Sequence, residues 1–418
     1  MVDIYHKRLQ DLAAQIKVKH NKQGLLVLFG AFERDGAVFL QESNFYYLTG
    51  INEPGAVLVS NLNDQADLWI TDTAGLRSKW VAGALNQEMA PKLGFEQIKY
   101  LGKQISGYEP NLFIKQENYA NLIQVLTQAV KNRDNIFTVK QNKLEQMFML
   151  DQLAKFIPGL DQLLVDVSDL IAELRRYKSE IEIDYICQAI DITGMAQEAA
   201  AKTIAPDILE CEVQAAIEYL FIAAGSTIAF PSIVGAGKNS TIMHYFQNDA
   251  KLEKNDLVVV DIGARYKNYC ADITRTYPVS GKFSKRQREI YELVLETQTY
   301  IAELAAPGFW LANSEQPDKS LLHLAREFMH ERGGYDKYFT HGIGHYLGLD
   351  VHDVGSRVLP LQEGDIITIE PGIYISEEKL GVRIEDNYLV TAKGVICLSE
   401  QIEKSVEQIE KQVSSGRW

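Results

Sequence analysis

Cysteine is scarce in this sequence: four of the 418 residues are cysteines, Cys187, Cys211, Cys270 and Cys397. They are scattered along the chain, and no two of them have the CxxC spacing of a redox or zinc motif. In a chain of this length such thiols are typical of a reduced, cytosolic protein. Cys270 lies close to Asp272, and we expect it to be a buried structural thiol rather than a soft metal ligand.

Long apolar segments are also lacking. No stretch approaches the roughly 20 consecutive apolar residues that a membrane-spanning helix needs, and the start, MVDIYHKRLQDL, lacks the apolar region of a signal peptide. Basic residues are outnumbered, 42 against 56 acidic ones, and the net charge of -14 argues against non-specific binding to nucleic acid or an anionic membrane. We therefore expect a cytoplasmic protein that binds neither nucleic acid nor membranes.

The chain is long enough for two or three domains, and its texture changes between residues 160 and 175. Before that point, short β-rich runs bounded by Gly, Asn and Asp give way to helical patterns, which predicts an α/β domain over residues 1–170. The expected strands cover 25–32, 37–40, 55–62 and 67–73, and the expected helices cover 117–132 and 142–156.

Residues 171–418 predict a second domain of the α+β class. A long helix is expected over 175–204, with Ser179 as its N-cap and Glu182 completing a capping box. Further helices are expected at 211–225, 284–305 and 319–333, with a charged surface helix or a frayed tail at 402–413. A hairpin follows each pair of helices, so we expect two similar halves and an antiparallel sheet covered by helices.

The first hairpin carries two acids inside apolar strands. In LVVVDIGARYKNYCADITRTYPV, a chain reversal near Tyr266–Asn268 would bring Asp261 and Asp272 nearly opposite each other on one face. Cross-strand neighbours have Cβ atoms about 4.5–5.5 Å apart, close enough for two carboxylates to share metal ions roughly 3.5–4 Å apart. Two unpaired aspartates would repel, so a bound cation is the natural way to keep both ionised.

The second hairpin repeats this pattern. In ITIEPGIYISEEKLGVRIEDNYL, a reversal near Glu377–Glu378 would place Glu370 across from Glu385, and Arg383 would share the strand face of Glu385. There Arg383 could orient a ligand carboxylate. One such acid alone would be typical of a solvated strand residue, but two hairpins that each present an acid pair indicate a metal site.

Three histidines lie in the run HGIGHYLGLDVHD. The i, i+4 spacing of His341 and His345 would suit a helical zinc pair, but the glycines between them favour an extended or turning backbone. We therefore expect one metal ligand, His345, and expect His341 and His352 to face a substrate. His244, in STIMHYFQ, is a fourth and weaker candidate.

Four carboxylates and one imidazole form a hard ligand set that suits Mn²⁺, Fe²⁺, Co²⁺ or Zn²⁺. The set has too many acids for the two-histidine, one-carboxylate site of iron oxygenases. Ser232 does not lie in a GxSxG elbow, and GAGKNST lacks the GxxxxGK[ST] spacing of a phosphate loop. A cluster with that many acids can hold two cations, and two cations close together activate a water for hydrolysis.

The order Asp, Asp, His, Glu, Glu within DIGARYKNYCADITRT, HGIGHYLGLDVHDVG, TIEPGIY and VRIEDN resembles the pita-bread metallopeptidases, and more narrowly their aminopeptidase P and prolidase branch. QESNFYYLTGINEPGAVLV resembles the amino-terminal domain of aminopeptidase P, and RRYKSEIEID the first helix of the catalytic domain. The resemblance implies an α/β amino-terminal domain over 1–170 and a pseudo-twofold pita-bread domain over 171–418.

The resemblance also implies two divalent metal ions, with Mn²⁺ favoured and Co²⁺, Zn²⁺ or Fe²⁺ as alternatives. Asp261 would bind one ion, Asp272 and Glu385 would bridge both, and His345 and Glu370 would each complete one ion. Glu370 would also shuttle the proton of a hydroxide that bridges the ions. The resemblance also implies that His352 and His244 would contact the substrate, with His341 nearby. Arg383 would contact a metal ligand and not a metal ion.

The function that the resemblance implies is that of a Xaa-Pro aminopeptidase, which releases the first residue of peptides with proline at position two. The alternative is a prolidase, which cleaves Xaa-Pro dipeptides, and a non-catalytic binding protein on this fold is a third hypothesis. Family members are commonly homodimers or homotetramers. Trp80 matches a position that can reach a neighbouring subunit's site, although we favour a packed aromatic there.

Overall fold

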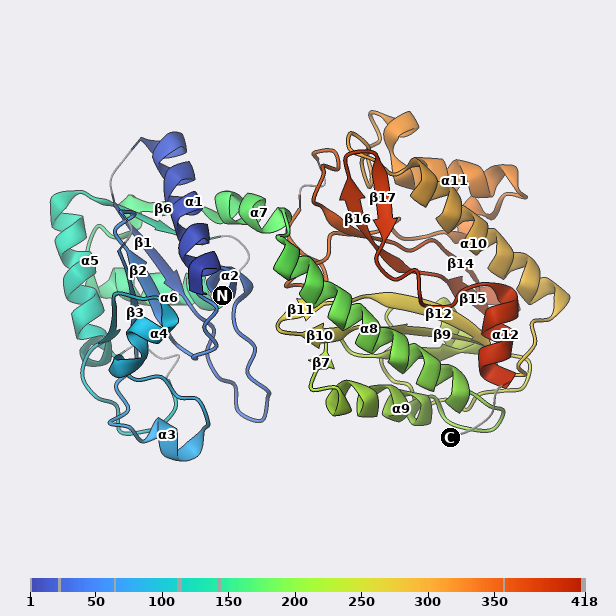
Figure 1. The fold of residues 1–418 in the computed structure, drawn as a ribbon, viewed down its shortest axis with the longest axis horizontal. Helices are drawn as coiled ribbons and strands as arrows, with labels where there is room; N and C mark the ends of the chain where they lie inside the picture. Colours follow the sequence, from blue (N-terminus) through green and yellow to red (C-terminus); the bar gives the residue numbers. More distant parts are fainter. Residues whose placement is uncertain are drawn as a thin grey trace. The chain divides into compact units, whose positions relative to one another are not determined.

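The computed structural model describes residues 2–21, 24–63, 65–110, 115–140, 144–355 and 358–414. The chain divides into two compact units, Met1–Arg175 (unit 1) and Arg176–Trp418 (unit 2). The division falls at the end of helix α7 (Ser168–Arg176), a few residues beyond the expected domain boundary at 170. Figure 1 shows both units, each with its own sheets and helices.

Unit 1 is a mixed sheet flanked by helices. Its strand order is β4-β3-β2-β1-β5-β6, with β1 (Gly24–Phe29) antiparallel to β2 and parallel to β5. Figure 1 shows α1 (Val2–His20) and α5 (Ala120–Asn132) on opposite sides of this sheet. The other elements are β2 (Val57–Ser60), β3 (Ala66–Ile70), β4 (Gln97–Tyr100), β5 (Asn135–Thr138), β6 (Leu164–Asp166), α2 (Ser43–Thr49), α3 (Arg77–Trp80), α4 (Ala90–Leu93) and α6 (Leu144–Phe156).

Two of the expectations for unit 1 are wrong, and one of its helices was not predicted. Helix α1 is absent from the prediction, although Leu12 and Ile16, one helical turn apart, are fully buried and carry its pattern. Residues 37–40 form no strand, and Val38 there is 86% exposed, because an isolated apolar run has no neighbour to pair with. Trp80 is 68% exposed instead of packed inside, and it stacks on Tyr108 with a ring distance of 4.8 Å.

Unit 2 contains two halves of similar construction. In the first, α8 (Glu180–Thr203) and α9 (Glu210–Ala223) accompany the sheet β12-β9-β8; in the second, α10 (Lys285–Leu304) and α11 (Leu321–Glu331) accompany the sheet β13-β16-β17 and the pair β14-β15 (Figure 1). The tail forms a helix, α12 (Val406–Ser414). The strands are β7 (Thr227–Ile228), β8 (Ile233–Ala236), β9 (Leu257–Ile262), β10 (Ala264–Tyr266), β11 (Tyr269–Cys270), β12 (Ile273–Pro278), β13 (Ile366–Ile369), β14 (Gly372–Ile375), β15 (Leu380–Arg383), β16 (Asp386–Thr391) and β17 (Gly394–Cys397).

The long helix of this unit begins where its cap was expected. Glu182 Oε2 accepts hydrogen bonds from the backbone N–H and the hydroxyl of Ser179, which satisfies donors that the first helical turn leaves free. The expected helix over 175–204 is confirmed from residue 180 onward, whereas Arg175 and Arg176 belong to α7. β9 is buried at all six of its positions, which explains the apolar run Leu257–Val260 that precedes Asp261.

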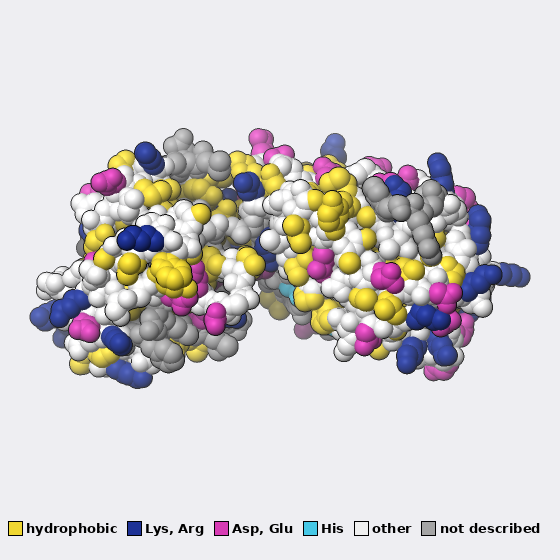
Figure 2. Space-filling view, turned by 90° about the horizontal axis from the view of Figure 1, so that it is seen from below, with side chains coloured by type: hydrophobic (Ala, Val, Ile, Leu, Met, Phe, Trp, Pro, Cys, Tyr) yellow, Lys and Arg dark blue, Asp and Glu magenta, His cyan; other side chains and the backbone are white. Residues whose placement is uncertain are grey.

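Among the described residues, no helix is both long enough and apolar enough to cross a bilayer. On the face drawn in Figure 2, acidic, basic and exposed hydrophobic side chains are interspersed. Such mixing is usual for the surface of a globular protein.

Candidate metal centre

The first acid pair lies on the hairpin of β9 to β12. Lys267 and Asn268 both have positive φ, 49° and 69°, and form a two-residue turn of the kind that fits the twist of a hairpin. The chain reversal is therefore confirmed, but the register is not the expected one. Asp261 pairs with Thr274, so that Asp272 is its diagonal neighbour on the same face rather than its partner directly opposite.

The second acid pair lies in a gap between two strand ladders. β13 pairs with β16 and β14 with β15 in one continuous register, which places Glu370 opposite Glu385 in the interval between the ladders, as expected. Neither N–H bonds within that hairpin: Glu370 N donates to Ile343 O at 2.9 Å, and Glu385 N donates to Thr274 O at 3.1 Å. These bonds tie the second hairpin to the histidine-bearing segment and to the first hairpin.

His345 reaches the acids from an extended segment beside β13. Its backbone exchanges hydrogen bonds with Thr368, and a Cβ at the preceding Gly344 would lie 2.0 Å from Thr368 O, so only glycine allows this approach. The ring Nδ1 lies 3.0 Å from Tyr346 O. Because a carbonyl only accepts, Nδ1 carries the proton and Nε2 is left as a lone-pair donor facing the carboxylates.

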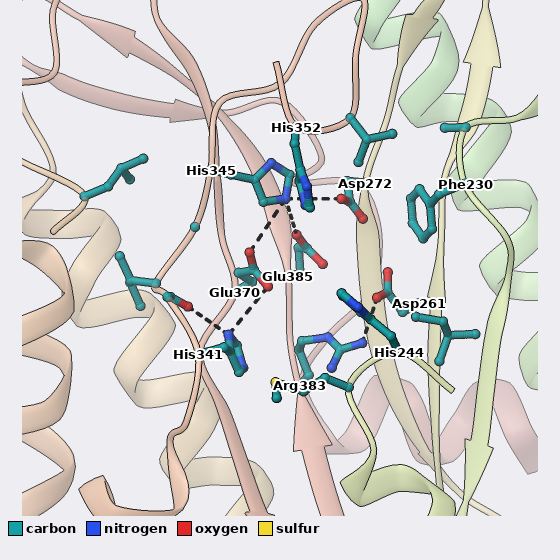
Figure 3. A pocket seen from close by; sticks show the side chains of 18 of the residues that line it. Phe230, His244, Asp261, Asp272, His341, His345, His352, Glu370, Arg383 and Glu385 are labelled. Atoms are coloured by element: carbon teal, nitrogen blue, oxygen red, sulfur yellow. Dashed lines mark hydrogen bonds and ion pairs between the residues drawn. The ribbon is translucent and has the colours of Figure 1, made fainter. Parts of the chain in front are cut away.

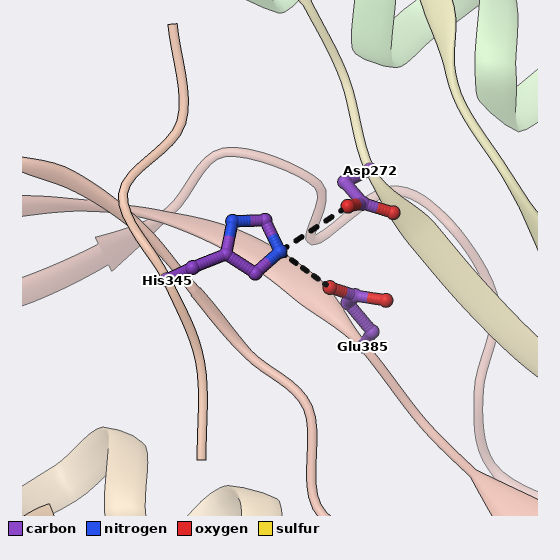
Figure 4. A group of neighbouring side chains, drawn as sticks. All are labelled: Asp272, His345 and Glu385. Atoms are coloured by element: carbon purple, nitrogen blue, oxygen red, sulfur yellow. Dashed lines mark ion pairs between the residues drawn. The ribbon is translucent and has the colours of Figure 1, made fainter. Parts of the chain in front are cut away.

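Four of the five expected metal ligands gather around His345 Nε2, and all five line the same cavity (Figure 3). His345 Nε2 lies 3.3 Å from Asp272 Oδ2, 3.6 Å from Glu370 Oε1 and 3.9 Å from Glu385 Oε1. Figure 4 isolates the group in which one ligand atom each from Asp272, His345 and Glu385 lies within 4.8 Å of the others. Asp261 lies on the other side of the cluster in the same cavity.

The charge of this cluster is unbalanced. Burial, together with the neighbouring Asp261 and Glu370, raises the pKa of Asp272 well above its usual value, and burial, with Asp272 and Glu370, does the same to the pKa of Glu385. Asp261 Oδ1, Asp272 Oδ1 and Glu385 Oε1 are buried and receive no hydrogen bond from any described residue. Buried carboxylate oxygens without donors fit divalent cations, which favour such hard oxygen ligands.

Arg383 lies behind the cluster and organises one side of it. It contacts the carboxylate of one expected ligand: Nη2 donates to Asp261 Oδ2 at 2.7 Å, and Nη1 donates to Tyr374 OH at 2.8 Å. The tyrosine hydroxyl lies 2.9 Å from His341 Nε2, and His341 Nδ1 lies 2.8 Å from Gly342 O. His341 is therefore neutral, with its proton on Nδ1; burial and the nearby Arg383 lower its pKa to about 3.

Two further residues of this site, Tyr374 and Thr274, were not predicted from the sequence, because their side chains do not ionise near neutral pH. Tyr374 links Arg383 to His341, and Thr274 donates to Glu385 Oε2 at 2.8 Å while accepting from Arg383 Nε at 3.1 Å. Thr274 lies two residues after Asp272, which strand alternation assigns to the same face, so that the signal was present. Cys270 is fully buried, as expected, and its thiol contacts Leu349 O.

The remaining two histidines line the cavity around the acids, which has a volume of about 580 Å³. The ring of His352 lies 4.3 Å from the ring of His345 at a steep angle, whereas His244 comes from the loop after β8 on the other side (Figure 3). That loop is held by Glu210 of α9, whose carboxylate accepts from Ala236 N and Ala250 N, at 2.8 and 2.9 Å. All of the expected site residues therefore line one cavity.

Known proteins resemble this chain over nearly its whole length. Residues 184–392 match the model of metallopeptidase family M24, and residues 5–117 match the N-terminal domain of aminopeptidase P. The Xaa-Pro aminopeptidase of Haemophilus influenzae is 34% identical over 400 residues, which cover 89% of this chain and 88% of that one. The Xaa-Pro dipeptidase of Pyrococcus furiosus is 43% identical over 241 residues, 56% of this chain and 66% of that one.

The fold agrees with these matches. The structure of aminopeptidase P from E. coli with the inhibitor Pro-Leu superimposes with a TM-score of 0.83 at 28% identity, covering 99% of this chain and 98% of that one. The expected fold class and the resemblance to the aminopeptidase P and prolidase branch are both confirmed. This chain belongs to metallopeptidase family M24.

Proposed function

We propose that this protein is a metal-dependent Xaa-Pro aminopeptidase, which hydrolyses the bond between an N-terminal residue and a proline at position two. The observation that carries the proposal is a set of three buried carboxylate oxygens that receive no hydrogen bond from any described residue and belong to Asp261, Asp272 and Glu385, which line the same open cavity as His345. The relatives named Xaa-Pro aminopeptidase match both the amino-terminal and the catalytic parts of the chain. The E. coli relative holds an inhibitor, Pro-Leu, that itself begins with proline.

We assign five residues as ligands of two divalent ions: Asp261, Asp272, His345, Glu370 and Glu385. Mn²⁺ is the ion we favour, with Co²⁺, Zn²⁺ or Fe²⁺ as alternatives, because four carboxylates and one imidazole form a hard set. Such ions, when bound, lower the pKa of a coordinated water and polarise a carbonyl oxygen. They would also balance the repulsion among the acids.

Glu370 is our candidate for the residue that moves the proton. Burial raises its pKa, although His345 and Arg383 oppose the shift, and a raised pKa brings a carboxylate closer to the range in which it can both take and return a proton at neutral pH. Thr368 Oγ1 lies 3.4 Å from Glu370 Oε1 and limits the motion of the carboxylate. Glu370 would accept the proton of the attacking water and deliver it to the proline nitrogen that leaves.

The other residues would hold the substrate and the ligands. We assign His352 and His244 to the substrate backbone and to the oxyanion that develops on the scissile carbonyl. Neutral His341 would line the substrate cavity, fixed by Tyr374. Arg383 would keep Asp261 ionised and oriented toward the ions.

A prolidase is the alternative function, and the 43% identity to the P. furiosus Xaa-Pro dipeptidase supports it for the catalytic part. The aminopeptidase is favoured because the match to the aminopeptidases extends through unit 1. We further propose a cytoplasmic homodimer or homotetramer. Whether Trp80 reaches a neighbouring subunit's site stays a prediction, which its exposure permits.

Product analysis by mass spectrometry tests the proposal. Mn²⁺-loaded protein would be offered a Xaa-Pro-Yaa tripeptide and the matching Xaa-Pro dipeptide. Release of free Xaa from the tripeptide is the expected result. Cleavage of the dipeptide alone would make the protein a prolidase, and no turnover of either peptide by protein that contains its metal would refute both assignments.

A further inference from the structure

The segment that opens unit 2 carries two buried cations that the proposed reaction does not use. Arg176 and Lys178 belong to the RRYKSE run, just before helix α8. Arg176 forms a two-point ion pair with Asp365, through Nε at 2.6 Å and Nη2 at 2.7 Å. Lys178 pairs with Asp353 at 3.3 Å, and both side chains are only 1% exposed. Both aspartates lie in the connection between His345 and β13, and Asp365 directly precedes the strand.

The Lys178–Asp353 pair is built into tightly packed surroundings. A Cβ at Gly348 would lie 2.1 Å from Asp353 Oδ2 and 3.0 Å from Lys178 Cε, so the pair occupies the space that a side chain would need. Asp353 N donates to Tyr346 O at 2.9 Å, which closes the loop on itself. The packing therefore restricts where the carboxylate can lie, and the ammonium group faces it as an ion pair at 3.3 Å.

The neighbour of Asp353 in the chain is His352. This histidine lines the cavity of the metal centre, with its ring 4.3 Å from that of His345 and inclined at 74°. Asp353 does not line the cavity; its side chain points inward to Lys178. The two neighbouring side chains therefore have different surroundings: His352 faces the cavity, and Asp353 is buried against Lys178, so the position of the Asp353 backbone also fixes where the His352 ring begins.

A buried ion pair costs desolvation energy that the attraction between the charges only partly returns, and apolar residues of the same volume are often as stabilising. The net contribution of the pair to stability is therefore small, but its geometry fixes one backbone position specifically. We propose that the Lys178–Asp353 ion pair is a positioning device that aims the His352 ring at the substrate bound in the metal centre. This inference rests on the proposed function, in which His352 contacts the substrate.

A double-mutant cycle tests the pairing. The variants are Asp353→Asn, His352→Ala and the two combined, measured as kcat and KM on a Xaa-Pro-Yaa tripeptide together with bound Mn²⁺ per chain. We expect His352→Ala to lower kcat about 100-fold, as for loss of one oxyanion donor, and Asp353→Asn to lower it about 10-fold, as for loss of a group that orients a ligand. The double variant should be no slower than His352→Ala alone, because the pair acts through that ring.

Glu53→Gln is the matched control, because Glu53 forms a buried ion pair with Arg77 at 2.6 Å in unit 1, with both side chains 8% exposed. It should reduce thermal stability and leave the non-additivity at residues 352 and 353 unchanged. Metal content should stay near that of the unaltered protein in all variants. Losses that multiply in the double variant would overturn the inference, since they would show that Asp353 acts independently of the ring.

Lys178→Met removes the cation of the ion pair instead of the carboxylate and tests the same positioning role independently. It should reproduce the effect of Asp353→Asn on kcat. If neither variant yields folded, metal-containing protein, the pair is a folding element and the inference is wrong. A His352→Ala variant with unchanged kcat would instead refute the role of His352 in the proposed function, so that the two failures are distinguishable.

Discussion

Gly344 offers the sharpest test of how the metal centre is held together. An alanine there would place Cβ 2.0 Å from the backbone oxygen of Thr368, and such contacts are essentially never shorter than 3.0 Å. The extended segment and β13 must therefore separate by about 1 Å. Since the next residue is His345, whose N–H and C=O both bond to Thr368, the displacement reaches the imidazole directly.

The magnitude follows from this geometry. A misplacement of about 1 Å at a reacting centre costs on the order of 100-fold in rate, which corresponds to about 2.7 kcal/mol of transition-state stabilisation. Gly344→Ala should therefore lower kcat/KM about 100-fold and weaken Mn²⁺ binding. The assays are tripeptide hydrolysis under saturating Mn²⁺ and calorimetric titration of the metal-free protein with Mn²⁺.

Gly342→Ala is the matched control. A Cβ at Gly342 would find its nearest neighbour 3.9 Å away, so this alanine fits without any shift, although it lies between His341 and the same loop. The control should keep nearly full activity and metal affinity. Equal effects of the two alanines, or full activity of Gly344→Ala, would refute the argument that close backbone approach positions the histidine.

Three further predictions concern ions, protons and stability. Arg383→Met leaves the buried Asp261 without its cation, and we expect a 10- to 100-fold weaker affinity for Mn²⁺, roughly the effect of losing a group that orients a ligand; a titration that shows unchanged affinity would contradict this. Folding raises the pKa of Asp272 and Glu385, so the folded, metal-free protein binds more protons than the unfolded chain above about pH 4. Its melting temperature in EDTA should therefore fall as the pH rises from 5 to 8, less steeply for Asp272→Asn, and Mn²⁺ should raise it most at the upper end; equal slopes for the two proteins would sink this reasoning. Ser284→Ala removes the N-cap of α10, far along the chain from the acids, and should cost about 1 kcal/mol in urea denaturation with kcat unchanged.

Much of the candidate metal centre could be predicted from the sequence, because the geometry of a hairpin depends on residues that are close in the chain. The reversal at Glu377–Glu378 could be placed from the residue types, and it correctly set Glu370 across from Glu385. In the first hairpin the same reasoning located the turn but missed the register by two residues, because the turn is centred on Lys267 and Asn268. Side-chain alternation preserves the face when the register slips by two, so the acids still shared one face.

The helix and strand patterns of unit 2 were equally local. The capping box at Ser179 and the apolar periodicity of α8 to α10 carried enough signal in short windows. Helix α1 was not predicted from its local sequence, because its buried stripe is narrow and its polar residues resemble those of an exposed terminus. For residues 37–40 the error was the reverse: a strand was predicted where none forms, since a strand needs a partner that the local sequence cannot supply.

The sequence alone thus determined which residues could bind metal and which faces of their strands they occupy, since the two-residue period of a strand and the reversal of a hairpin depend on neighbours in the chain. Only the tertiary structure decided the rest: that three carboxylate oxygens lack donors among the described residues, that Tyr374 and Thr274 complete the network, and that Lys178 lies against Asp353. Those contacts join residues up to about 175 positions apart. Burial and the packing of distant segments create them, and no local pattern records either.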